Sequence, residues 1–144
     1  MLARTGLDPQ EALICTMVLV AAADGGRITD REIGVMSGLV QTLPVFRTFT
    51  TDQLRQATEA TIALLAEEEG LAHAAGLIRD ALEPRLRETA YVLACEVVAA
   101  DDTHSQSILQ MLEFVMTELE LDPLIAAAIE RCVRARYRPL DRAA

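Results

Sequence analysis

The sequence has no tryptophan and few aromatic residues of any kind. Phe, Tyr and Trp together make up 3% of its 144 residues, whereas 51% of the residues are hydrophobic. A core built from aliphatic side chains is more typical of packed helices than of sheets. No segment shows the apolar and polar alternation of a strand, and there is no Gly- or Ser-rich linker. We therefore predict an all-α protein whose length fits a single compact domain, residues 1–144.

Basic residues are also scarce. Lys and Arg number 13 against 22 Asp and Glu, which gives a formal net charge of −9. A surface of this sign repels nucleic-acid phosphates and anionic lipid headgroups, because like charges face each other. We therefore expect no nucleic-acid partner, and we expect cations and protein partners with basic surfaces.

Cysteines are few and far apart. Cys15, Cys95 and Cys132 each lie in an apolar helical stretch, and an odd, separated set is not a disulfide framework. We expect buried, unreactive thiols and a reducing compartment. The first residues lack the layout of a signal peptide, and the apolar run from Leu13 to Ala23 is shorter than the ~18 residues of a membrane span. These features predict a cytoplasmic protein without direct membrane insertion.

Helix start and stop signals are present through most of the chain. Asp8-Pro9 and Asp122-Pro123 each place a capping side chain before a first-turn proline, and Thr29 with Glu32 has the spacing of a capping box. The pattern predicts about seven helices, at approximately residues 9–23, 29–43, 50–69, 71–82, 84–100, 103–119 and 123–135.

The chain also resembles itself. The segment from Val18 to Asp24 is similar to the segment from Glu96 to Asp102, and each is followed by a Thr and another amphipathic helix. Two copies at so long a spacing suggest a duplicated helical unit and not a solenoid, which needs more repeats. We predict two halves, residues 9–69 and 84–135, related by a pseudo-twofold axis, followed by a tail at residues 136–144.

Both copies end a helix on acidic residues. Asp24 in the first copy, and Asp101 with Asp102 in the second, add charge to the negative end of a helix dipole, at a cost of ~0.3–1 kcal/mol each where nothing compensates. Arg27 is a possible partner in the first copy, but only His104 follows in the second. A divalent cation would compensate both helix ends.

The candidate ligands are all oxygen donors. They are Asp24, Asp30 and Glu32 in the first half and Asp101 and Asp102 in the second. Carboxylates suit hard cations, so Ca²⁺ or Mg²⁺ is favoured over a Zn²⁺ ion that would also use a histidine.

The loop does not have the spacing of an EF-hand. If Gly25 took the glycine position of that motif, Val20 and Ala22 would fall at the first and third ligand positions, and neither carries an oxygen in its side chain.

These residues resemble a known family. Ala22-Ala23-Asp24-Gly25, then Ile28 and Glu32-Ile33, with a second Ala-Ala-Asp segment in the other half, are similar to the TerB family of tellurite resistance proteins, over about residues 9–135. The resemblance implies a compact helical domain with internal pseudo-symmetry, an acidic cluster that binds divalent metal, and a role in tellurite and general stress responses. TerB-like domains also occur as modules in other proteins, including a membrane-linked co-chaperone.

The chain departs from the family pattern in two places. Gly26 is one extra loop residue, which changes how Glu32 faces Asp24. In the second half the family has Gly after Asp101 and a Glu seven or eight positions further, whereas this chain has Asp102 and then Ser107, Ile108 and Leu109. The second site is therefore expected to be weaker.

Two function classes remain open. The first is a non-enzymatic, cation-binding TerB-like protein that engages protein partners. The second is a metal-free interaction scaffold, in which Asp24 and its glycines only stop a helix, Thr29 and Glu32 only cap one, and a basic C-terminal region docks on an acidic surface. That region contains Arg131, Arg134, Arg136, Arg138 and Arg142. The sequence shows no nucleophile beside a base and no phosphate-binding loop, so we expect no enzyme.

Overall fold

Every regular element in the described residues is a helix. The computed structural model describes residues 6–100 and 105–141. Its elements are α1 (Pro9–Ala21), α2 (Asp30–Thr42), a short 3-10 helix η1 (Pro44–Phe46), α3 (Thr51–Leu65), α4 (Gly70–Ala81), α5 (Pro84–Ala99), α6 (Gln106–Glu118) and α7 (Pro123–Arg136). The predicted all-α class is confirmed, and the described part of the chain holds seven α-helices.

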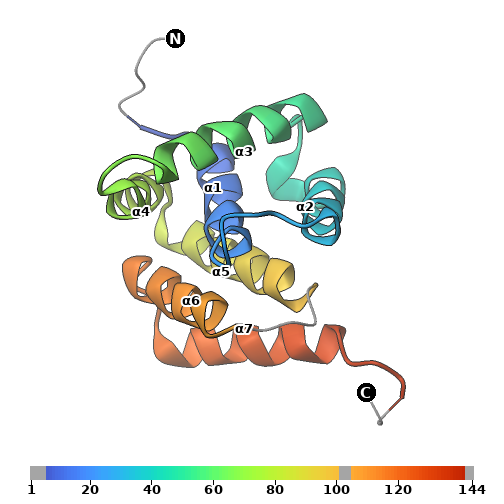
Figure 1. Ribbon diagram of the computed structural model, residues 1–144. Coiled ribbons are helices and arrows are strands. Elements are labelled where there is room, and N and C mark those ends of the chain that lie inside the picture. The colour runs from blue at the N-terminus through green and yellow to red at the C-terminus, as the bar shows by residue number, and fades with distance from the viewer. Residues whose placement is uncertain (1–5, 101–104, 142–144) are drawn as a thin grey trace.

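Helix α1 lies in the middle of the molecule, surrounded by other helices (Figure 1). Its residues from Ala12 to Ala21 are all buried, with at most 3% of any of them exposed. A helix that is apolar on every side must be covered on every side. Helices α3, α4, α5 and α6 pack against it.

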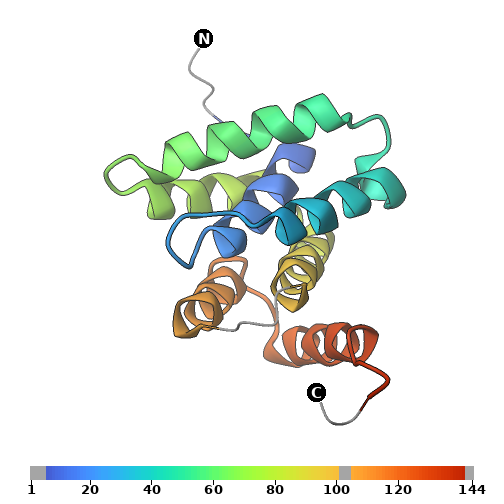
Figure 2. The same cartoon turned by 45° about the vertical axis from the view of Figure 1, so that its right-hand side comes forward.

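Helix α5 is the second central helix. It packs against α1 and also contacts α2, α6 and α7 (Figure 2). All the helices contribute to one hydrophobic core, and its fully buried aromatic members are Phe46 and Tyr91. The remaining buried core is aliphatic or carries sulfur, as the composition predicts.

The packing partners of the two central helices correspond. Helix α1 contacts α3 and α6, and α5 contacts α7 and α2. If α1 to α3 are matched to α5 to α7, each of these contacts has a counterpart. Helix α4 has no counterpart in this comparison, and it lies between α3 and α5 in the sequence. The duplication itself stays a prediction.

The helix starts follow the capping signals closely. The side chains of Asp8, Thr29, Thr50 and Asp122 each accept a hydrogen bond from a backbone N–H of the first turn that follows. The expected start of the sixth helix at Thr103 is wrong. Helix α6 begins at Gln106, because the Ser105 hydroxyl accepts from the Ile108 N–H and caps it there.

The end of α3 also differs from the prediction. Helix α3 ends at Leu65 rather than near Glu69, because the chain turns through a left-handed residue at Glu69, with φ of 61°, before α4 begins. Gly70 follows so closely on α3 that a β-carbon there would lie 2.2 Å from the Leu64 carbonyl oxygen. The three glutamates at 67–69 therefore belong to the connection and not to a helix.

Candidate functional site

The end of α1 is an acidic turn opened by two glycines. The Ala22 N–H continues the helix by donating to the Val18 carbonyl, and the Gly26 N–H donates back to the Ala22 carbonyl at 3.0 Å. Gly25 and Gly26 have φ of 81° and 76°, a left-handed conformation that a β-carbon disfavours. These two residues turn the chain and leave Asp24 exposed at the negative end of α1.

Asp24 is not compensated by a neighbour in the described part of the chain. The last turn of α1 has no basic residue. Within residues 6–100 and 105–141, neither a hydrogen bond nor an ion pair reaches the Asp24 carboxylate, and Arg27 does not pair with it. The dipole argument therefore still applies to this residue.

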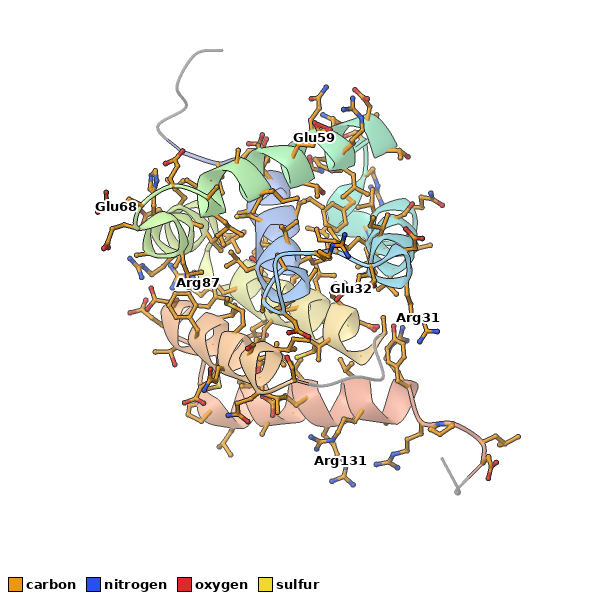
Figure 3. The ribbon with its side chains drawn as sticks, in the orientation of Figure 1. Arg31, Glu32, Glu59, Glu68, Arg87 and Arg131 are labelled. Carbon is orange, nitrogen blue, oxygen red and sulfur yellow. The ribbon has the colours of Figure 1, made fainter. Side chains whose placement is uncertain are left out.

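Glu32 is buried at the start of α2, with 3% of the residue exposed. Its Oε1 accepts from the Thr29 N–H at 2.8 Å and from the Thr29 hydroxyl at 3.0 Å, and the Glu32 N–H donates to that hydroxyl at 3.1 Å. The predicted capping box is confirmed. Figure 3 shows Glu32 turned toward the interior, whereas its neighbour Arg31 points outward.

The three predicted ligands of the first site are not gathered around one point. Asp24 and Asp30 are exposed, and Glu32 is directed inward. In the part of the chain that the structure describes, no three Asp, Glu, His or Cys side chains are placed to hold a metal ion. Asp30 lies in the first turn of α2, where a negative charge is favourable. The other predicted ligands, Asp101 and Asp102, lie outside the described residues, as does His104.

The second half holds a buried carboxylate that sequence reasoning missed. Glu96 on α5 is 2% exposed, and both of its oxygens accept from Arg136 Nε, at 3.0 and 3.1 Å. The Tyr137 hydroxyl donates to the same carboxylate at 3.2 Å. The hydrogen bond to Glu96 raises the pKa of the Arg136 guanidinium above its ordinary value, and burial followed by the charge of Glu96 raises the pKa of Tyr137. A single Glu inside the run Cys95-Glu96-Val97-Val98 was the available signal.

The C-terminal arginines therefore have different roles. Arg136 anchors the end of α7 to α5 through Glu96, while Arg131 and Arg134 are exposed on α7. Figure 3 shows Arg131 directed away from the rest of the molecule. Arg138 is exposed beyond the helix, and Arg142 lies outside the described residues.

The thiols follow the prediction at two of three positions. Cys15 and Cys95 are buried, and burial raises their pKa to about 11 and about 12, so both stay protonated near neutral pH. The expectation of a buried thiol is wrong for Cys132, which is exposed on α7. The apolar face of α7 instead turns Ala126 and Val133 inward.

None of the helices in the described residues is both long and apolar enough to cross a bilayer.

No curated protein and no solved structure matched the chain. A family model described as "Tellurite resistance protein TerB" matches residues 10–131, which is most of the chain and includes the acidic turn, the capping box, all of α5 and all of α1 except Pro9. The chain therefore belongs to the TerB family.

Proposed function

We propose that this protein is a non-enzymatic, cytoplasmic tellurite-resistance and stress-response protein that binds a divalent cation at the end of α1 and engages protein partners. Membership of the TerB family supports the tellurite-resistance role. The observation that supports the cation is Asp24, an exposed carboxylate at the negative end of a buried helix, with no positive group compensating it in the described residues.

The oxygen donors are of the type that a hard cation prefers. In the conformation described, however, the carboxylates of the first half are too few at one point to coordinate an ion by themselves. Asp24 and Asp30 offer exposed oxygens, whereas Glu32 Oε1 is held by Thr29. Asp24 would therefore be the primary ligand of the first site, with Asp30 as its second carboxylate. Asp101 and Asp102, which lie outside the described residues, would form the separate second site. Ca²⁺ or Mg²⁺ is the favoured ion, because all of these donors are oxygens. Bound there, the ion would neutralise charge at the helix end.

The test is a titration of the full chain with CaCl₂ and with MgCl₂, followed by calorimetry. Wild type should bind, and Asp24→Asn should bind at least tenfold more weakly. Asp80→Asn is the matched control, because Asp80, like Asp24, is an exposed carboxylate at the C-terminal end of a helix, here α4, yet it lies in no predicted site. Equal binding by wild type and Asp24→Asn, or binding by neither, would remove the cation from the proposal.

A metal-free interaction scaffold is the alternative. The observation in its favour is that the Glu32 carboxylate is already used as a helix cap, and that Arg131 and Arg134 are exposed on one helix. In this case a partner would bind equally well with and without EDTA, and Arg131→Glu with Arg134→Glu would abolish the interaction. Loss of partner binding in EDTA alone would instead support the cation.

A further inference from the structure

A groove of about 550 Å³ opens between α5, α6 and α7. Its walls are apolar side chains of α6 and α7, and its floor is α5. The lining includes Leu109, Leu112 and Met116 from α6, Ala126 and Ala127 from α7, and Tyr91 from α5. Volumes in this range, with mostly apolar walls, are typical of sites for small organic ligands.

The first half has a smaller groove at the corresponding place. It lies between α2 and α3, measures about 230 Å³, and is lined by Ile33, Met36 and Leu54 among others. Counted from the first residue of each helix, Ile33 and Met36 of α2 correspond to Leu109 and Leu112 of α6. The same type of helix pair therefore forms a groove in each half.

Two small residues enlarge the second groove. Leu54 and Arg55 of α3 correspond by the same count to Ala126 and Ala127 of α7. An alanine in place of a leucine, and another in place of an arginine, leaves much less side-chain volume at these two lining positions. The groove therefore reaches down to Tyr91 on α5, a depth that the first groove does not have.

A hydrogen-bonded carboxylate lies in the lining of the larger groove. The Tyr91 hydroxyl donates to Glu130 Oε2 at 2.5 Å, and Glu130 is half-buried. Among residues 6–100 and 105–141, no ion pair is formed by Glu130, by Glu113 or by Arg134, the other charged groups that line the groove. In the described part of the lining, two carboxylates against one guanidinium give a net negative charge.

We propose that this groove binds a small amphiphilic organic cation, with its apolar body between α6 and α7 and its ammonium group at Glu130. The half-buried Glu130 carboxylate has no ionic partner, so a ligand with a cationic group is favoured there. A hydrogen bond between an ammonium group and a carboxylate is stronger than one between neutral groups. The size favours a small molecule over a docked helix. The α6 wall from Leu109 to Met116 has a helical rise of only roughly 10 Å, which would accommodate about two turns of a docked helix.

Three probes with eight carbons each separate the contribution of the apolar chain from that of the charged end. They are n-octylammonium chloride, 1-octanol and sodium octanoate. Each is titrated into the ¹⁵N-labelled full chain in EDTA, so that the result is independent of divalent cations, and amide shifts are followed. We expect shifts concentrated on α6 and α7, with octylammonium binding roughly tenfold more tightly than octanol, and octanoate weakest. Tightest binding of octanoate would assign the polar end to Arg134 and overturn the proposal.

Variants locate the site. Ala127→Leu restores bulk at a lining position and should weaken octylammonium binding at least tenfold. Ala128→Leu, the same change one residue along the exposed surface of α7, should not. Glu130→Gln keeps an acceptor for Tyr91 and should erase the preference for octylammonium over octanol. Unchanged binding in Ala127→Leu, or equal shifts at the groove of Ile33 and Leu54, would overturn the proposal.

A peptide occupant is the competing possibility. A synthetic amphipathic helix of leucine and lysine is therefore added as a fourth probe. If the peptide binds this groove more tightly than octylammonium, and if Ala127→Leu weakens its binding, the groove is a helix-docking surface and the small-molecule proposal is wrong.

Discussion

Glu32 and Glu96 are both buried carboxylates, 3% and 2% exposed, but they are satisfied in different ways. Glu32 is bonded by Thr29, three residues earlier in the chain, whereas Glu96 is bonded by Arg136, forty residues later. Thr29 supplies neutral donors and leaves the negative charge in place, while Arg136 cancels the charge of Glu96. The buried carboxylate of the first half is therefore held by neutral donors, whereas the buried carboxylate of the second half is paired with a cation.

This difference bears on where a cation would bind. The positive end of the α2 dipole offsets part of the Glu32 charge, but Asp24 lies at the negative end of α1 and has no such offset. A site in the first half would gain more from a bound cation than one formed at Glu96, where an arginine already occupies the carboxylate.

The largest expected effect on the free energy of unfolding comes from the buried thiols, which, unlike the carboxylates of Glu32 and Glu96, are buried in their neutral form. The chain has no lysine, so thiols and phenols dominate its titration above pH 9. Burial raises the pKa of Cys15 from 9.0 to about 11. Above pH 9 the unfolded chain loses this proton and the folded chain keeps it, so stability falls as pH rises, by about 1.4 kcal/mol per pH unit for each such thiol.

Urea unfolding at pH 8, 9, 10 and 11 measures this slope. Cys15→Ala should flatten the fall in free energy between pH 9 and 11, although it also lowers stability at every pH. Cys132→Ala is the matched control, because that thiol is exposed and its removal should leave the slope unchanged. Identical slopes in all three proteins would contradict the role of the buried thiol.

Breaking the long-range pair should have the next largest effect. Arg136→Met leaves the Glu96 carboxylate buried without its cation, and loss of one partner of a fully buried pair costs about 3–5 kcal/mol. The Arg136 side chain is 61% exposed and water can replace part of it, so we expect about 2 kcal/mol. Chemical denaturation of Arg136→Met, with Arg134→Met as control, measures the difference. Addition of Glu96→Gln to Arg136→Met should recover stability, and failure to do so would show that the ion pair is not the cause.

Breaking the local cap should cost less. Thr29→Ala removes the hydroxyl that bonds both Glu32 Oε1 and the Glu32 N–H, and loss of an N-cap typically costs about 1 kcal/mol. Thr50→Ala removes the equivalent cap of α3, whose partner Gln53 is exposed, and it should cost less than Thr29→Ala. Equal losses, measured by thermal unfolding, would mean that the burial of Glu32 adds nothing to its cap.

The same contrast explains how much of the molecule could be predicted from its sequence. Asp8, Thr29 and Thr50 satisfy backbone groups within one turn of themselves, so their roles follow from spacing alone. The ion pair of Glu96 joins α5 to α7, and only the packing of those helices reveals it. The end of α3 was also hidden, because it depends on a left-handed Glu69 and on the close approach of Gly70 to Leu64. The candidate cation site was predicted as a set of residues, and part of that set, Asp101 and Asp102, lies outside the described chain.

In the absence of divalent cations Asp24→Asn should have the smallest effect on stability, and the sign of that effect is informative. In EDTA the substitution removes an uncompensated negative charge from the end of α1 and should stabilise the fold by about 0.3–1 kcal/mol. In saturating Ca²⁺ the order should reverse, because a ligand at a hundredfold excess over its Kd adds about 2.7 kcal/mol to the protein that binds it. Asp80→Asn should show no such reversal, since Asp80 lies at the end of α4 and in no predicted cation site. If Asp24→Asn is the more stable protein under both conditions, the carboxylate only ends a helix and the cation binds elsewhere or not at all.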